Sequence, residues 1–155
     1  MNYWLMKSEP DAFSIDDLAN KPKQTTPWDG VRNYQARNMM RDQMKKGDLI
    51  FFYHSSCKQP GIVGLATVVT EAYPDFTAFE VKNKYYDPKS DPNKPRWYMV
   101  DVQLVRKLKR NISLQELKEY KSLAGIPLLQ RGNRLSVMPI SKKQWDFILK
   151  LENKA

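Results

Sequence analysis

Four stretches of the chain carry the apolar patterns that β-strands show: residues 3–7, 48–54, 61–72 and 97–108. The last stretch, WYMVDVQLVRKL, places apolar side chains on every second position, which is typical of a strand with one covered face. DLIFFYH is apolar on both alternations, as expected for a strand that is covered on both faces. A shorter strand-like run follows Arg134.

Three serines stand at the expected start of a helix. Each is followed three positions later by a residue that can reach back to the helix start: Ser14 by Asp17, Ser113 by Glu116 and Ser141 by Gln144. The hydroxyl and the third following residue satisfy amide groups that a helix start leaves without partners. A fourth helix is expected over NYQARNMMRDQM, ending before Lys46-Gly47.

The order of these elements indicates the fold class. Helices fall irregularly among the strands without a β-α-β alternation, which favours an α+β domain around a mixed, curved sheet. The segment 85–97 holds three prolines and is expected to be a long exposed loop within the domain. A chain of 155 residues is expected to form a single domain, here over residues 1–155.

Composition narrows the class of protein. Hydrophobic residues make up 41% of the chain and charged residues 28%, as in an ordinary globular protein. The longest apolar run, 49–53, is too short to span a bilayer. The N-terminus lacks the basic region and apolar stretch of a secretory signal. One cysteine, Cys57, excludes an internal disulfide and fits a reducing compartment, so a cytoplasmic location is expected.

The formal net charge of +9 is spread unevenly. Residues 96–155 hold thirteen Lys and Arg against five Asp and Glu, whereas residues 1–95 hold thirteen against twelve. A basic bias of this kind suggests a polyanionic partner such as nucleic acid.

Catalytic and metal-binding chemistry has few candidates. His54 is the only histidine and Cys57 the only cysteine, so neither a histidine cluster nor a Cys/His zinc site can be assembled. No glycine-rich phosphate loop is present. A dyad of His54 with Ser55 or Cys57 is disfavoured, because adjacent residues of a strand point to opposite faces. We therefore expect no metal site and no catalytic residue.

Polar and aromatic groups gather instead at the ends of the predicted elements. Three motifs place them there: KSEP at 7–10, PWDGVRNYQARN at 27–38 and FFYHSS at 51–56. Each has a purely structural alternative, with Trp28 in the core, Asn33 as a helix cap and Ser8 closing a turn. Taken together they favour a binding pocket, since pockets form where loops leave a rigid scaffold.

Six motifs run through nearly the whole chain in this order: YWLMKSEP, WDGVRNYQARNMM, GDLIFFYHSS, GIVGLATV, WYMVDV and IPLLQRGNRLSVMPIS. The series resembles that of the EVE domain family, which belongs to the PUA-like superfamily and is related to the YTH domains that read methylated adenine in RNA. The resemblance implies a curved, mostly closed mixed β-barrel of about five or six strands flanked by helices. It also implies a module that binds modified bases in DNA or RNA, without cofactor or turnover. We expect the module to be a monomer.

The matched motifs also imply a site. Its base-binding pocket would be lined by Lys7, Ser8, Trp28, Asp29, Gly30, Val31, Asn33, Tyr53, His54, Ser55 and Ser136. The base, extruded from a duplex or presented by a single strand, would stack on Trp28, with Asn33 and Ser8 on its Watson–Crick edge. Flanking phosphates would be held by the arginines of QRGNR and two lysines at a helix start: Arg131, Arg134, Lys142 and Lys143.

Three other functions stay open at this point. The nearest is a general RNA-binding PUA-like module without preference for a modification. Another is an enzyme of hydrolase type that acts on a modified base or nucleotide, with Asp29 or His54 as the proton carrier. The chain offers no acid–base pair at a convincing spacing for it. A purely structural interaction protein would leave the basic bias unused.

Overall fold

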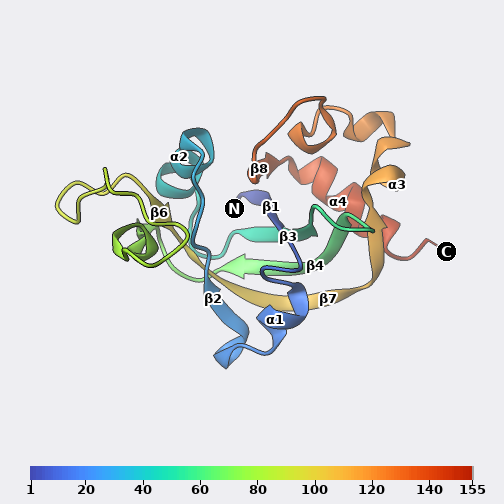
Figure 1. Cartoon of the computed structure of the whole chain (residues 1–155). Helices are drawn as coiled ribbons and strands as arrows, with labels where there is room; N and C mark the ends of the chain where they lie inside the picture. Colours follow the sequence, from blue (N-terminus) through green and yellow to red (C-terminus); the bar gives the residue numbers. More distant parts are fainter. Residues whose placement is uncertain (155) are drawn as a thin grey trace.

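Six strands form one curved sheet in the order β2-β7-β4-β3-β1-β8, shown in Figure 1. The computed structural model describes residues 1–154, so the predicted domain end at residue 155 lies outside the described part. The strands are β1 Tyr3–Ser8, β2 Thr25–Pro27, β3 Leu49–His54, β4 Gly61–Val68, β7 Asp101–Ser113 and β8 Val137–Ile140. β1 and β3 are parallel, and the other neighbouring strands are antiparallel.

The predicted mixed, curved sheet is confirmed, but it is a half-barrel that stays open between its edge strands β2 and β8. Both edge strands contain a proline, Pro27 and Pro139. Proline has no amide hydrogen to donate, so it is tolerated at a sheet edge and hinders further pairing there. A separate two-stranded ribbon pairs β5 (Tyr73–Pro74) with β6 (Tyr98–Met99).

Four α-helices flank the sheet: α1 Ile15–Ala19, α2 Tyr34–Asp42, α3 Leu114–Lys118 and α4 Lys142–Leu151. Four short 3₁₀ turns lie between strands and helices: Pro22–Gln24, Phe76–Phe79, Lys121–Leu123 and Pro127–Leu129. None of the helices described is long and apolar enough to cross a membrane.

The three predicted serine caps are all present. Ser14 and Ser141 form complete capping boxes with Asp17 and Gln144. Ser113 accepts the amide hydrogen of Glu116 at 3.1 Å, but the return bond expected from Glu116 is replaced by another contact. Its carboxylate instead binds the Arg110 guanidinium through two bonds of 2.7 and 2.8 Å, because a charged pair is the stronger interaction.

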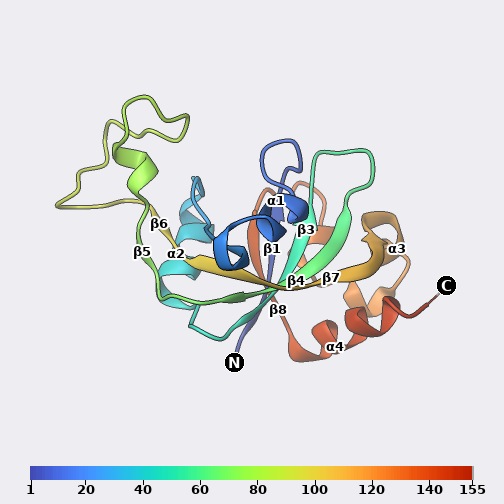
Figure 2. The ribbon, with the colours of Figure 1, turned by 90° about the horizontal axis from the view of Figure 1, so that it is seen from below.

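The core lies on both faces of the sheet, as Figure 2 shows with α1 and α4 on opposite sides. On one face the Trp145 ring of α4 stacks on Phe51, with ring centres 3.8 Å apart. On the other, Trp28 packs edge-on against Phe52, with ring centres 5.4 Å apart. The alternating residues of β3 thus serve two separate layers, as its doubly apolar pattern predicts.

Two strand ends differ from prediction, one strand was not predicted, and the predicted strand 97–108 is divided between β6 and β7. β4 ends at Val68, short of the predicted residue 72, and β7 continues to Ser113 through a basic stretch. β2 is missed because three residues, TTP, carry no readable alternation. The segment 85–97 is turn-rich as predicted, yet its last residue, Trp97, is only 6% exposed.

Candidate functional site

A cavity of about 990 Å³ opens at the carboxyl ends of the parallel strands β1 and β3. Its walls come from six parts of the chain: the end of β1 with the residues that lead to α1, Lys21, residues 26–32, Ser55, residues 82–85, and the segment before β8. This volume lies in the range of sites that enclose a small organic molecule. We call it the cavity below.

Backbone hydrogen bonds bring these distant segments together. The Lys7 amide donates to the Ser136 carbonyl at 2.8 Å, and the Ser55 amide donates to the Ser8 carbonyl at 3.0 Å. The Trp28 amide donates to the Val100 carbonyl of the sheet at 2.8 Å. Main-chain bonds depend little on side-chain rotamers, so this part of the cavity wall is fixed by the sheet itself.

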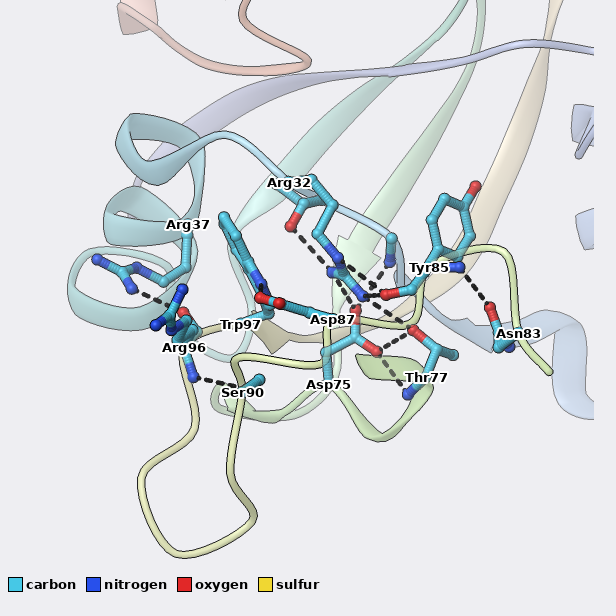
Figure 3. Close-up of polar contacts among 12 residues, drawn as sticks. Arg32, Arg37, Asp75, Thr77, Asn83, Tyr85, Asp87, Ser90, Arg96 and Trp97 are labelled. Carbon is cyan, nitrogen blue, oxygen red and sulfur yellow. Dashed lines mark hydrogen bonds and ion pairs between the residues drawn. The ribbon is translucent and has the colours of Figure 1, made fainter. Parts of the chain in front are cut away.

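The Asp29-Gly30 turn is held by a buried carboxylate, shown in Figure 3. Asp75, which is 0% exposed, accepts the Gly30 amide hydrogen at 2.8 Å and an Arg32 guanidinium hydrogen at 3.0 Å. Arg32 also donates to the Tyr85 carbonyl at 2.6 Å. Gly30 has φ +79°, and an added Cβ would collide with the Tyr85 ring, so glycine is required beneath that ring.

Trp28 belongs to the core and to the cavity wall at once. It is 8% exposed and packs on Phe52, yet it also lines the cavity. A place in the core and a role in binding are therefore compatible at this residue. A base that enters the cavity would meet an indole whose position the core already determines.

Positive charge surrounds the cavity. Six of its lining residues are cationic: Lys7, Lys21, Arg32, Lys82, Lys84 and Arg134. Two are acidic, Glu9 and Asp29. Among residues 1–154, Arg32 is the only one of the six cations in an ion pair. Their charges are otherwise free to attract an anionic ligand.

Two titratable groups of the cavity are shifted by burial. Burial lowers the pKa of the Lys7 ammonium. It raises the pKa of the Asp29 carboxyl, and the negative charge of nearby Asp75 raises that pKa further. In both groups burial disfavours the charged form. A phosphate beside Lys7, or a hydrogen-bond donor of a base beside Asp29, would replace the solvation that each group has lost.

The structure brings nine of the predicted site residues together around the cavity: Lys7, Ser8, Trp28, Asp29, Gly30, Val31, Ser55, Arg134 and Ser136. Six others do not line it: Asn33, Tyr53, His54, Arg131, Lys142 and Lys143. Contact of any of these residues with a base or phosphate stays a prediction.

Three of the residues outside the cavity have structural contacts. Asn33 caps α2, since its side-chain oxygen accepts the Ala36 amide hydrogen at 2.9 Å. Tyr53 is 2% exposed, and burial raises the pKa of its phenol to about 12. His54 accepts the Ile15 amide hydrogen at its Nε2 atom, at 3.1 Å.

Most of the basic residues among residues 96–155 lie outside the cavity. Four of those cations form ion pairs: Arg106 with Glu152, Lys107 with Asp16, Arg110 with Glu116 and Lys142 with Asp146. Of the thirteen Lys and Arg residues in this part of the chain, Arg134 alone lines the cavity. The other five cavity cations come from the nearly neutral first part of the chain.

Sequence reasoning missed several residues of the cavity wall: Lys21, Arg32, Lys82, Lys84 and Tyr85. The sequence does indicate Lys82, Lys84 and Tyr85, because KNKYY at 82–86 interleaves basic and aromatic residues, a pattern typical of nucleic-acid binding. Asp75 had no signal, since its partners Gly30 and Arg32 lie more than forty residues away. Within residues 1–154, no three His, Cys, Asp or Glu side chains are grouped closely enough to hold a metal ion.

Comparison with known proteins adds relatives for the whole chain. The family model described as EVE domain matches residues 2–151. Mouse "Thymocyte nuclear protein 1" is 56% identical, over 97% of this chain and 74% of that protein. A crystal structure of human THYN1 protein, in complex with DNA that contains 5-methylcytosine, is 51% identical with a TM-score of 0.92, and the match covers 100% of this chain and 99% of that one.

A more distant neighbour bears on the fold alone. The YTH domain of the Zygosaccharomyces rouxii MRB1 protein, solved with N6-methyladenosine RNA, has a TM-score of 0.55 at 12% identity. The match covers 99% of this chain and 88% of that one. The two domains share the curved sheet and its flanking helices.

Proposed function

Because this chain belongs to the EVE domain family, we propose that it is a nucleic-acid-binding module that reads a modified base in the cavity. The observation that carries the proposal is the cavity itself: an indole wall and six cations around a hollow at the ends of two parallel strands. The human relative that was crystallised with 5-methylcytosine DNA supports it, since the two chains are 51% identical over their length.

The cavity separates two tasks. Its cations attract the phosphate backbone, which is common to every sequence and supplies most of the affinity. Its interior offers Trp28 for stacking and the serine hydroxyls of Ser8, Ser55 and Ser136 for hydrogen bonds. An extruded base fits this arrangement because its ring faces are apolar and its edge is polar.

The size of a methyl group limits the preference that such a cavity can have. Burial of one methyl group stabilises a complex by ~0.8 kcal/mol, which is about fourfold in affinity. A larger preference requires that the unmodified base leave a polar group without a partner. We therefore expect a modest preference unless the Asp29 carboxyl contacts the base edge.

We further propose binding without turnover. His54 has little support as the proton carrier of an enzyme, because its Nε2 accepts the Ile15 amide hydrogen and its ring does not line the cavity. Asp29 does line the cavity. Incubation of modified oligonucleotides with the protein, followed by mass spectrometry, tests whether the protein alters them. A changed base or a shortened strand would contradict binding without turnover.

The central experiment is fluorescence anisotropy on matched single strands and duplexes. The strands carry cytosine, 5-methylcytosine or 5-hydroxymethylcytosine in DNA, and adenine or N6-methyladenine in RNA, each at two salt concentrations. Tighter binding of one modified strand at both salts would support the proposal. Equal binding of modified and plain strands would reduce the protein to a general nucleic-acid binder.

Trp28→Leu tests the stacking wall. We expect the variant to bind a modified strand about 5- to 150-fold more weakly, because base stacking on an aromatic ring is worth ~1–3 kcal/mol. Trp145→Leu is the matched control, since Trp145 is also a buried core tryptophan, but on the opposite face of the sheet. Thermal melting measures what each substitution costs in stability. Equal loss of binding in both variants would show that Trp28 acts only through folding.

A further inference from the structure

Outside the cavity, one exposed face of α2 combines an aromatic ring with arginines. Tyr34, Arg37 and Arg41 stand three and four positions apart, so they share one face of the helix. Tyr34 is 51% exposed, although tyrosine is a large and largely apolar side chain. We call these three residues, together with Trp97 beneath them, the α2 face.

The α2 face is built and held in place. The Trp97 ring stacks on Tyr34 with ring centres 4.7 Å apart and planes 23° apart. Trp97 is itself fixed, since its indole nitrogen donates to Asp87 at 2.7 Å. The Arg37 guanidinium lies 4.8 Å from the Tyr34 ring centre and donates to the Arg96 carbonyl at 2.7 Å. A rigid platform of this kind loses little entropy when a ligand stacks on it.

The α2 face is continuous with the cavity. The Arg32 guanidinium lies between two rings, 5.5 Å from the centre of Tyr85 in the cavity wall and 5.3 Å from the centre of Trp97. Figure 3 shows Arg32 between these two side chains, with Arg37 and Arg96 beyond Trp97. Alternating rings and guanidinium groups thus lead from the cavity wall to the exposed helix.

Charge favours an anionic occupant. Arg37 makes no ion pair among the described residues, and Arg41 binds only its neighbour Asp42. That pair is exposed, at 38% and 52% of the side chains, so it is weak and can exchange for a phosphate. Asp87 accepts the Trp97 indole hydrogen and forms no ion pair with either arginine among the described residues.

We propose that the α2 face binds the nucleotides that flank the base in the cavity. A flanking base adds to the Trp97–Tyr34 stack, while Arg37 and Arg41 contact the adjacent phosphates. Single-stranded nucleic acid is recognised in this way, by aromatic platforms beside a basic track. The proposal rests on the proposed function, because it takes the cavity as the place of the first base.

The test combines a protein variant with a ligand variant. Tyr34→Leu removes the aromatic ring but still covers Trp97. Two strands of about nine nucleotides are compared, within the ~4–16 nucleotides that single-strand modules occupy. Both carry the modified base in the middle, and in the second strand the flanking nucleotides keep their phosphates but lack their bases.

We expect Tyr34→Leu to bind the complete strand at least about fivefold more weakly than the unchanged protein does. The two proteins should bind the strand with abasic flanks equally well. Equal weakening on both strands, or no weakening on either, would overturn the proposal, because the ring would then not contact a flanking base. Failure of the proposed function gives a different result: the unchanged protein would not distinguish modified from plain strands.

Arg41→Gln tests the phosphate contact separately. We expect the salt dependence of single-strand binding to fall by about 0.7 in the slope of log affinity against log salt, the value for one phosphate contact. Lys150→Gln is the matched control, because Lys150, like Arg41, is an exposed cation in the last turn of its helix and lies outside the cavity and the predicted phosphate contacts. Equal slopes in Arg41→Gln and the unchanged protein would contradict a role for Arg41.

Discussion

His54 ends β3 in contact with groups that require its neutral form. Its ring stands edge-on to Phe52, with ring centres 5.7 Å apart, and its Nε2 accepts the Ile15 amide hydrogen at 3.1 Å. Only an unprotonated nitrogen can accept that bond. Burial lowers the pKa of His54, and the carboxylate of Asp16 opposes this shift in part.

We therefore expect the free energy of unfolding to decrease as the pH falls below about 6.5. The unfolded chain binds a proton at His54 before the folded chain does, so acid favours unfolding until folded His54 is also protonated. His54→Gln places an amide oxygen where Nε2 stood and should reduce this dependence. Urea unfolding between about pH 5 and 7.5 measures it. An unchanged pH slope in the variant would contradict the assignment.

At the scale of residues, contacts close in sequence were predictable and distant ones were not. Ser14 and Ser141 cap their helices as expected, because the partner lies three positions away. Asp75 shows the limit. It is fully buried and orders the Gly30 turn, yet nothing in its local sequence indicates a partner 45 residues earlier. At Glu116 two interactions compete. Its carboxylate was expected to bind the start of the helix, but it binds Arg110 instead.

At the scale of elements, one side chain joins the segment 75–97 to the connection between β2 and α2. Arg32 binds Asp75 and the Tyr85 carbonyl and lies between two aromatic rings, as Figure 3 shows. The guanidinium geometry is essential here, because it donates in several directions within one plane and stacks on rings. A lysine would keep the charge but lose the fork and the stacking.

Arg32→Lys should accordingly loosen this segment. We expect faster amide hydrogen exchange over residues 76–90, with the β3 amides unchanged. The loss of stability should be smaller than the ~3–5 kcal/mol that follows removal of a buried charge partner, because lysine still neutralises Asp75. Hydrogen exchange read by mass spectrometry locates the effect. Uniformly faster exchange across the sheet would mean that Arg32 supports the whole fold.

The elements with a long, regular pattern were predicted and the irregular ones were not. β1, β3 and β4 lie within or close to their expected ranges, because a run of apolar and β-branched residues over five or more positions is readable. The cavity walls at the ends of β1 and β3 follow from those strands. Residues 82–85 form another wall of the cavity, but a turn-rich segment has no period to indicate where it folds back.

At the scale of the whole molecule, net charge and useful charge are separate properties. The last sixty residues supply most of the net charge, yet their cations are largely paired or lie away from the cavity. The cavity takes its cations mainly from a region with almost no net charge. Position in the fold, and not position in the sequence, decides which charges meet a ligand.

Two double variants with the same loss of charge test this separation. Lys82→Gln with Lys84→Gln removes cavity cations, whereas Lys118→Gln with Lys150→Gln removes exposed cations near the ends of α3 and α4. We expect the first to weaken nucleic-acid binding and to lower the salt slope by about 1.5, for two contacts at ~0.7–0.9 each. The second should leave the slope unchanged. Equal effects would mean that overall charge governs binding.

The backbone bonds that join Lys7 to Ser136 and Ser8 to Ser55 also couple ligand binding to the melting of the protein. The end of β1 lines the cavity and β1 lies between β3 and β8, so unfolding of these strands also removes the ligand site. By mass action, a ligand at a hundred times its dissociation constant stabilises the folded chain by ~2.7 kcal/mol. For a chain of this size that raises the melting temperature by roughly 5–10 °C. A thermal screen of modified nucleosides and short strands would therefore identify the natural ligand without any label on it.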